Sequence, residues 1–245
     1  MILFEHVCFA YTEGQSAVHN IHLKIPHGEN VAVAGANGAG KSTLLKLAAG
    51  RLAAGKGSIM ADGIPVQTDS LTLLQRKIGY IGQQHSHSAD STVKNYIAAS
   101  PRGCGYSKAE VNDLTAYAIE TMHLKPLAKR NMDTLSLGEQ RMVDIAAVLA
   151  KQPSILILDD PTAFLDAKAR YCLMNSLQAL HHTKLIATHD LDLALTLCGK
   201  VIVLKEGNVY AYGSTQTLLR NVSLLQACNL ELPFSAQTYN IYAYR

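Results

Sequence analysis

The sequence predicts an α/β fold in which a mixed or parallel sheet is flanked by helices and carries an antiparallel β lobe and a helical subdomain. Three observations predict this fold class. A glycine-rich turn at residues 35–43 stands between an apolar run and a helical run. Apolar runs typical of buried parallel strands return at 155–159, 184–188 and 201–204, with helical patterns between them. Strands that alternate with helices around such a turn form a doubly wound core.

The individual elements follow in chain order. Residues 2–9 and 18–25 alternate apolar and polar side chains, which predicts strands of an antiparallel lobe, and 59–63 continues this lobe with a turn. After residue 84 the pattern changes to that of helices. These helices are expected at about 92–99, 108–123 and 136–150, and the apolar strands then follow.

We expect one domain that spans residues 1–245. Within it, 1–84 and 155–215 form the core with the antiparallel lobe, 85–150 forms the helical subdomain and 216–245 forms a C-terminal helical tail. Because the glycine-rich turn precedes the helical segment and the buried strands follow it, this segment is an insertion into the core.

The composition is that of an ordinary globular protein. Of the 245 residues, 48% are hydrophobic and 17% are charged, and the net charge is +3. The longest basic cluster, Lys129 and Arg130, is only a pair, which argues against a nucleic-acid partner. We expect neither a signal peptide nor a membrane span, because no apolar run approaches about 18 residues. The widely spaced cysteines predict free thiols in a reducing compartment: Cys8, Cys104, Cys172, Cys198 and Cys228.

The glycine-rich turn predicts a site for nucleotide phosphates. A strand that breaks into such a turn and then opens a helix directs backbone N–H groups and the positive helix end at one point. Lys41 would reach the β- and γ-phosphates, and Ser42 would give its hydroxyl to Mg²⁺. The alternative, an ordinary glycine-rich turn, is disfavoured by the flanking strand and helix. The expected nucleotide-binding residues are Gly35, Ala36, Asn37, Gly38, Ala39, Gly40, Lys41, Ser42 and Thr43.

Polar residues with catalytic potential follow two of the apolar strands. Asp159 and Asp160 end the strand at 155–159, where one carboxylate can lie beside the metal ion and the next can face the attacking water. His189 follows the strand at 184–188 and can donate to the γ-phosphate. Each of these residues alone fits an ordinary polar strand end, but the phosphate turn is expected at the same sheet edge.

Gln83 is a further candidate, because it follows the apolar run that ends at Ile81. Its neutral amide could contact Mg²⁺ and the lytic water at the mouth of a loop. Gln84 is the alternative, so the sequence places this amide only to within one residue.

Residues 135–141 open a helix and predict a second anion site. Ser136 caps the helix, and exposed N–H groups around Gly138 can bind an anion. Because Lys41 already occupies the phosphates in its own chain, the second site is expected to serve a neighbouring copy, with the nucleotide in the seam of a dimer. A capped helix start alone would carry no such meaning. The residues expected to contact nucleotide in trans are Ser136, Leu137, Gly138 and Glu139.

Together these residues resemble the nucleotide-binding subunits of ABC transporters, over essentially the whole chain. The ordered motifs are the Walker A loop at 35–43, the Q-loop at Gln83, the signature at 135–139, Walker B at 155–159, the D-loop at 163–166 with Asp166, and the switch histidine His189. The resemblance implies a P-loop NTPase core, an ATP-sandwich dimer and ATP hydrolysis. It also implies that Tyr11 stacks on adenine, although one tyrosine on a strand would otherwise favour a structural role.

The resemblance divides the site residues into roles. The catalytic residues would be Asp160, His189 and Gln83, and the ligands of Mg²⁺ would be Ser42, Gln83 and Asp159. ATP and Mg²⁺ are therefore the expected cofactors.

A narrower resemblance is to energy-coupling-factor transporters, especially their cobalt/nickel uptake group. It rests on the sequences at 135–139 and 187–194 and on the tail at 224–233. It implies two ATPase subunits, as a homodimer or with a paralogue, that drive a transmembrane coupling protein and a substrate-capturing membrane protein from the cytoplasmic face of the membrane. The coupling helices would enter a groove near Gln83 and the helical insertion.

The pair His85 and His87 suggests a metal site only weakly. Two histidines in a loop lack a third ligand, so we interpret them as exposed polar loop residues. In an importer of this kind the metal cargo would pass through the membrane proteins.

The sequence departs from the family pattern at two positions. Asp160 stands where the family has a glutamate that polarises water, and its side chain is one methylene shorter. A displacement of about 1 Å at a reacting group costs roughly 100-fold in rate, so we predict slow hydrolysis. Leu137 stands where the broad family usually has glycine, and we interpret it as a mark of the narrower group.

Three functions compete at this point. The first is an ATPase that powers membrane transport, and the second is a nucleotide-gated clamp in which Asp160 makes hydrolysis incidental. The third is a soluble ABC protein that acts on DNA or ribosomes. The spacing between Lys41 and Asp159, with no long heptad insertion and no second cassette, argues against the third.

Overall fold

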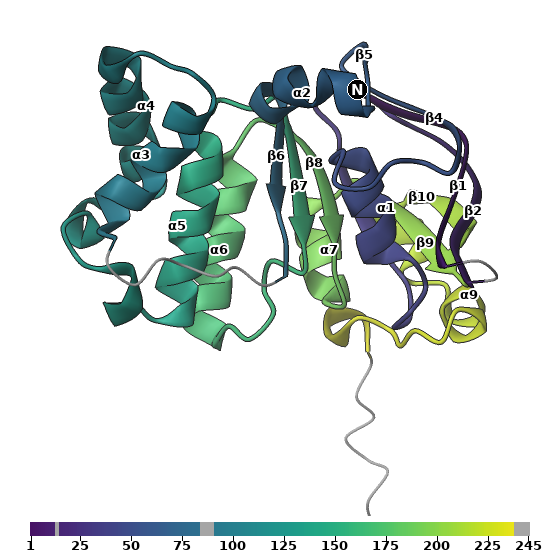
Figure 1. The fold of residues 1–245 in the computed structure, drawn as a ribbon. Helices are drawn as coiled ribbons and strands as arrows, with labels where there is room; N and C mark the ends of the chain where they lie inside the picture. Colours follow the sequence, from purple (N-terminus) through teal and green to yellow (C-terminus); the bar gives the residue numbers. More distant parts are fainter. Residues whose placement is uncertain (13–14, 84–90, 238–245) are drawn as a thin grey trace, which may run out of the picture.

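The computed structural model describes residues 1–12, 15–83 and 91–237, and its centre is a mixed six-stranded sheet (Figure 1). The strand order is β10-β9-β3-β8-β7-β6, with β10 antiparallel to β9 and the other pairs parallel. The α/β fold class predicted from the sequence is therefore confirmed. The strands of this sheet are β3 (Asn30–Ala34), β6 (Ile78–Ile81), β7 (Ile155–Asp159), β8 (Thr183–Ala187), β9 (Lys200–Lys205) and β10 (Asn208–Ser214).

A second sheet of four antiparallel strands forms the lobe, in the order β2-β1-β4-β5. Ile2 of β1 pairs with Ile25 of β2 on one side and with Ala61 of β4 on the other. All three side chains are buried, because alternate residues of these strands face the core. The strands of the lobe are β1 (Ile2–Thr12), β2 (Gln15–Ile25), β4 (Lys56–Ala61) and β5 (Ile64–Pro65).

The central sheet has a separate hydrophobic core on each face, since successive strand residues point to opposite faces. Ile155 and Ile157 of β7 pack in the core that also contains the lobe and the first helix. Leu156 and Leu158 pack in the other core, which contains the helical subdomain and the C-terminal helices. Both faces are covered, which explains the apolar runs at 155–158 in β7 and 185–187 in β8.

The helices fall into groups that Figure 1 shows around the sheet. The lobe side holds α1 (Lys41–Ala48) and α2 (Leu71–Lys77). The helical subdomain consists of α3 (Val93–Gly103), α4 (Lys108–Thr121) and α5 (Leu137–Leu149). The later helices are α6 (Ala167–Ala179), α7 (Leu191–Leu197), α8 (Thr215–Leu218) and α9 (Val222–Ala227). Short 3₁₀ turns lie at Thr68–Ser70, Lys125–Leu127, Met132–Thr134 and Phe234–Ala236.

Two helices differ from the sequence prediction. The first helix of the subdomain was expected to end near residue 99, but α3 continues to Gly103 and includes Pro101. The proline lies in the last turn and is buried, so packing outweighs its tendency to end the helix. The second element, α2, falls in a segment for which the sequence predicted no helix; only Leu74 of α2 is buried, which leaves little periodic signal.

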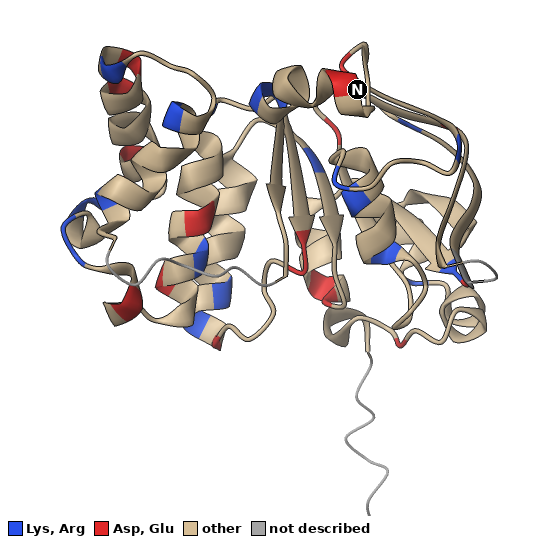
Figure 2. Cartoon of the chain, in the orientation of Figure 1, with Lys and Arg blue, Asp and Glu red and all other residues tan. Residues whose placement is uncertain are grey.

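In the described part of the chain, no helix combines the length and apolar character needed to cross a membrane. Figure 2 shows basic and acidic residues dispersed over the elements, with acidic residues at the lower ends of the central strands. These strand ends carry the candidate site.

Candidate functional site

The phosphate turn connects β3 to α1 and is held in one backbone conformation. The Ala39 N–H donates to the carbonyl of Ala36 over 3.1 Å. Gly40, the residue before α1, has a φ of 100°, and a Cβ there would lie 2.5 Å from the carbonyl oxygen of Ala17. Only glycine fits this position, so the turn depends on the residue that the sequence pattern singles out.

Lys41 begins α1 and directs its ammonium group back into the turn. Its Nζ donates to the carbonyl oxygens of Gly35 and Ala36, over 2.7 and 3.0 Å. Burial lowers the pKa of Lys41, while the charges of Asp160 and Asp159 act in the opposite direction. A buried ammonium group in this position gains most from an anionic partner such as a phosphate.

Ser42 and Asp159 meet although they lie 117 residues apart in the sequence. The Ser42 hydroxyl donates to Oδ1 of Asp159 over 3.1 Å. Burial raises the pKa of Asp159; the Ser42 hydrogen bond opposes this shift, and the neighbouring Asp160 reinforces it. A desolvated carboxylate beside a hydroxyl is a donor set that fits Mg²⁺, which prefers oxygen ligands and takes its remaining ones from water and phosphate.

The same observation limits what kind of metal site this is. Among the described residues, no group of three or more His, Cys, Asp or Glu side chains is placed to hold a metal ion. A cation at Ser42 and Asp159 would therefore depend on nucleotide oxygens for its remaining ligands.

Asp160 and His189 face each other at the end of the sheet. The Asp160 Oδ2 lies 3.6 Å from Nε2 of His189. Asp160 has a φ of 49°, a left-handed conformation that aspartate tolerates better than most residues, and its N–H donates to Ala187 O over 2.9 Å. The backbone of Asp160 is thus held by the last residue of β8, and His189 lies two residues beyond this strand.

These side chains line one pocket of about 460 Å³ at the carboxyl ends of the central strands. Tyr11 reaches it from β1, and its hydroxyl lies 3.2 Å from Oγ1 of Thr43. Gln83 reaches it from the end of β6. The predicted residues that the structure brings together here are Tyr11, Asn37, Gly38, Gly40, Lys41, Ser42, Thr43, Gln83, Asp159, Asp160 and His189. Gln84, His85 and His87 fall outside the described residues.

The signature residues form the start of α5 and are capped within it. Ser136 accepts from the Glu139 N–H over 3.3 Å, and the Glu139 carboxylate accepts from the Ser136 N–H over 2.8 Å. Leu137 is 62% exposed. A Cβ on Gly138 would lie 2.5 Å from Cβ of Ala169, so this glycine permits the close contact of α5 with α6. These four residues are absent from the lining of their own chain's nucleotide pocket as the structure describes it.

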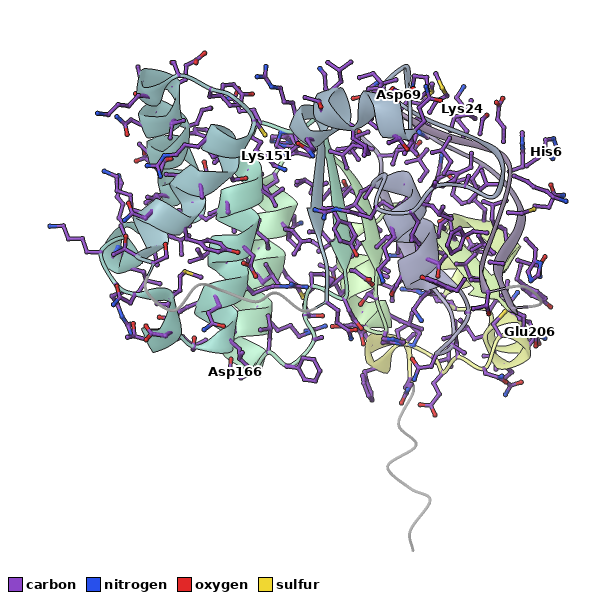
Figure 3. The ribbon with its side chains drawn as sticks, in the orientation of Figure 1. His6, Lys24, Asp69, Lys151, Asp166 and Glu206 are labelled. Atoms are coloured by element: carbon purple, nitrogen blue, oxygen red, sulfur yellow. The ribbon has the colours of Figure 1, made fainter. Side chains whose placement is uncertain are left out.

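The predicted D-loop residue Asp166 caps α6 at the lower edge of the molecule, where Figure 3 labels it. Its Oδ1 accepts from the Ala169 N–H over 2.7 Å. Four residues later, Arg170 donates through Nε to Oδ2 of Asp190 over 2.5 Å, and this hydrogen bond raises the pKa of Arg170. Asp190 follows His189, so this ion pair links α6 to the loop that carries the histidine.

Sequence reasoning missed Arg141, which lies on α5 and is almost fully buried. Its guanidinium donates to four backbone carbonyl oxygens, those of Gly82 (2.7 Å), Asp159 (3.1 Å), Pro161 (3.2 Å) and Asp160 (3.3 Å). Burial lowers the pKa of Arg141, and Asp144 is the largest opposing influence. The available signal was the single basic residue of a helix whose later positions are mostly apolar.

The fold and this pocket define a class of protein. A glycine-rich turn at the start of α1, a lysine within it, and a serine–aspartate pair beside it at the carboxyl edge of a mostly parallel sheet make a P-loop nucleotide-binding domain. The family described as ABC transporter matches residues 18–163. The chain belongs to this family, as an ATP-binding subunit.

Relatives match over nearly the whole chain. An ABC transporter ATP-binding protein of Geobacter sulfurreducens is 41% identical over 94% of this chain and 93% of its own length. The energy-coupling factor transporter ATP-binding protein EcfA2 of Methanospirillum hungatei is 35% identical over 92% of this chain and 58% of its own length.

Solved structures of similar fold include ABC cassettes in different assemblies. cbiO1 from Clostridium perfringens, part of the ABC transporter complex cbiONQ, has a TM-score of 0.80 and 29% identity, and the match covers 96% of both chains. A dimeric cassette in a post-hydrolysis state, bound to ADP and Pi, has a TM-score of 0.79 and 27% identity, over 88% of this chain and 99% of its own.

Proposed function

We propose that this chain hydrolyses ATP to power an energy-coupling-factor importer of transition-metal ions, cobalt or nickel. The observation that carries the ATPase is the pocket in which Lys41, Ser42 and Asp159 meet Asp160 and His189. The narrower assignment is supported by the similarity to EcfA2 and to cbiO1, each along more than nine-tenths of this chain.

In the proposed reaction each side chain acts on a different part of the nucleotide. Lys41 exchanges its bonds to the turn carbonyls for phosphate oxygens, and Tyr11 packs on the adenine. Ser42 and Asp159, with Gln83, hold Mg²⁺, which offsets the charge that develops on the phosphates. Asp160 orients the attacking water.

His189 would contact the γ-phosphate beside Asp160. Its ring Nε2 lies near the Asp160 carboxylate, which favours an orientation that points into the pocket. The contact would distinguish ATP from ADP, because only ATP has the γ-phosphate.

A second copy or a paralogue would complete the site with residues 136–139. Their capped helix start leaves Leu137 exposed and lies apart from the pocket of its own chain. A related cassette is dimeric, which supports pairing of this kind. Each subunit would be a single domain of residues 1–245. We assign 1–84 and 155–215 to its catalytic core, 85–150 to its helical subdomain and 216–245 to its C-terminal tail.

The membrane proteins would contact a groove between the core and the helical subdomain. A cavity of about 520 Å³ lies there, between the end of α1, α2 and the end of α3. Leu74 and Tyr80 give it apolar walls, and Arg51 and Lys151 give it positive charge. This groove fits a short helix of the transmembrane coupling protein, and Tyr80 lies on the strand that leads to Gln83. The chain would then work at the cytoplasmic face of the membrane.

One observation favours a second candidate, a nucleotide-gated clamp with weak hydrolysis. Asp160 stands where the family pattern has glutamate, and its side chain is shorter. Its backbone N–H is held by a hydrogen bond to the carbonyl oxygen of Ala187. If the carboxylate lies about 1 Å from the position that orients water, hydrolysis slows by roughly 100-fold while ATP still closes the pair.

The test is purification of the tagged subunit from its native membrane in detergent, followed by identification of the co-purifying proteins and measurement of phosphate release. We expect integral membrane partners, ATP-dependent phosphate release, and uptake of Co²⁺ or Ni²⁺ by vesicles containing the complex. Phosphate release at background level in that complex would favour the clamp. A chain that purifies without any membrane protein would contradict both.

A further inference from the structure

Phe164 is a large apolar side chain four residues after Asp160 in the sequence, and it is 77% exposed. Its φ of 63° is a left-handed conformation that bulky residues rarely adopt. The loop around it is nevertheless fixed, since Ala163 N donates to Asp160 O over 3.1 Å and Leu165 N donates to Thr162 O over 3.3 Å. A strained aromatic residue held outward in this way indicates a partner that uses it.

A cavity of about 780 Å³ opens directly beside this loop. Asp160, Ala163 and His189 line its side toward the nucleotide pocket. The tail segment 230–237 also lines the cavity and contributes most of its large apolar side chains. The large apolar residues of the lining are Leu191, Leu230, Leu232, Pro233 and Phe234.

The tail that closes this cavity is attached to α7. The carboxylate of Asp192 accepts the backbone N–H groups of Phe234 and Ser235, over 2.9 and 3.0 Å. The wall is therefore a fixed part of the surface, and it ends in the exposed side chain of Phe234.

We propose that Phe164 of each subunit inserts into this cavity of a second copy of the chain. This inference rests on the proposed function, because it needs the two subunits to pair with ATP in the seam. Ala163 lines the cavity and Phe164 is the next residue, so the projecting ring and the hollow lie side by side on one surface. A two-fold axis between them places each ring in the other subunit's hollow, which is the self-complementarity that a symmetric dimer requires.

The position of the cavity favours a second copy over any other partner. Asp160 and His189 line both the nucleotide pocket and this cavity, so a subunit that covers the nucleotide also lies over the cavity. Two of the charged residues that line the cavity are paired with each other, since Arg170 donates to Asp190. An aromatic ring can therefore enter without leaving either charge without its partner.

The pairing would bring the tail into the dimer interface. A ring in the cavity contacts the 230–237 wall and the loop of His189 at the same time. The tail would then stabilise the closed, ATP-bound pair.

The experiment compares dimerisation of the full chain and its variants with ATP and Mg²⁺, by analytical ultracentrifugation in the Asp160→Asn background, which slows hydrolysis further. Phe164→Gly should raise the dimer Kd at least about 30-fold, the effect of an interface hot spot. Its thermal stability should stay unchanged or rise, because glycine adopts the positive φ without strain. Leu232→Arg, in the cavity wall, should raise the Kd similarly.

Tyr117→Ala is the matched control, since Tyr117 is an exposed aromatic residue on α4. It should leave the dimer Kd within about 2-fold. If the parent chain stays monomeric with ATP and Mg²⁺, the paired-cassette function fails and this inference fails with it. If the parent pairs and Phe164→Gly pairs with the same Kd, only the insertion of Phe164 is overturned.

Discussion

At the scale of single residues, the pocket buries charged groups beside partners that oppose the effect of burial on their pKa values. Burial raises the pKa of Asp159, against the hydrogen bond from Ser42, and burial lowers the pKa of Lys41, against the two neighbouring carboxylates. Each group is thus held where its charged form costs solvation energy. A cation on the carboxylate side and a phosphate on the ammonium side would relieve both costs together, which is consistent with the proposed binding of MgATP.

Lys41→Met tests the ammonium side. We expect MgATP to bind about 10- to 100-fold more weakly, because charge-assisted hydrogen bonds contribute about 1.5–3 kcal/mol. Titration with a fluorescent ATP analogue measures the Kd, and Lys56→Met on β4, which is exposed, is the control that should bind normally. An unchanged Kd for Lys41→Met would remove the phosphate role of this residue.

Asp160→Glu tests the departure from the family pattern. In the assembled complex, the longer side chain should increase the rate of phosphate release. The increase should reach about 100-fold if the Asp160 carboxylate of the wild type lies about 1 Å from the position that orients water. Glutamate tolerates the φ of 49° at this position less well than aspartate, so a slightly lower Tm is expected. A variant no faster than the wild type would show that Asp160 is already placed for hydrolysis.

At the scale of elements, α5 is the connection between the helical subdomain and the core. It presents the signature residues at its start, and one turn later Arg141 binds the carbonyl groups at the end of β7 and beyond β6. The Tyr96 hydroxyl of α3 donates to Asp144 of α5 over 2.9 Å, so α3 is bonded to α5. These hydrogen bonds connect the helical subdomain to the backbone next to Asp160 and Gln83.

Arg141→Met should reveal this connection. Removing the guanidinium leaves buried carbonyl groups without donors, so the free energy of unfolding should fall by about 2–4 kcal/mol. Urea denaturation measures the change, and Arg102→Met, on the exposed surface of α3, should stay within about 0.5 kcal/mol of wild type. Equal stability of the two variants would mean that the four hydrogen bonds contribute nothing net.

At the scale of the whole molecule, the C-terminal tail packs back on α7, the helix that follows His189. Partial burial pushes the pKa of Asp192 upward, but hydrogen bonds from Ser235 and Phe234 outweigh it, so the pKa lies below 3.8. A carboxyl group with a lowered pKa stabilises the docked tail fully above its unfolded pKa. This contribution is lost as the pH falls through the folded value, and docking should be complete at neutral pH.

Asp192→Ala should release the tail without unfolding the core. We expect faster hydrogen exchange at residues 229–237 and faster cleavage there by a protease at pH 7, because the variant removes the acceptor of two backbone N–H groups. Asp113→Ala, on an exposed part of α4, is the matched control. Protection at 229–237 equal to wild type would show that apolar contacts alone hold the tail.

Much of the architecture could be predicted because its signals are local. The glycine-rich turn, the apolar runs that became β7, β8 and β9, and the alternating segments that became β1 and β2 are each readable within about ten residues. The structure confirmed the α/β fold with its lobe and helices. α2 was missed because it buries only Leu74, and the last turn of α3 was missed because the buried Pro101 stays within the helix.

The sequence by itself determined the kinds of groups in the site and their order along the chain, since motif chemistry depends on residue type and short spacing. Only the tertiary structure decided the contacts that no motif records: Arg141 with the carbonyl of Asp159 in β7, and the tail with Asp192. The physical reason is that such contacts are made by packing between elements. A pattern within one segment records how that segment folds, whereas its partners are selected by the shape and burial of the whole molecule.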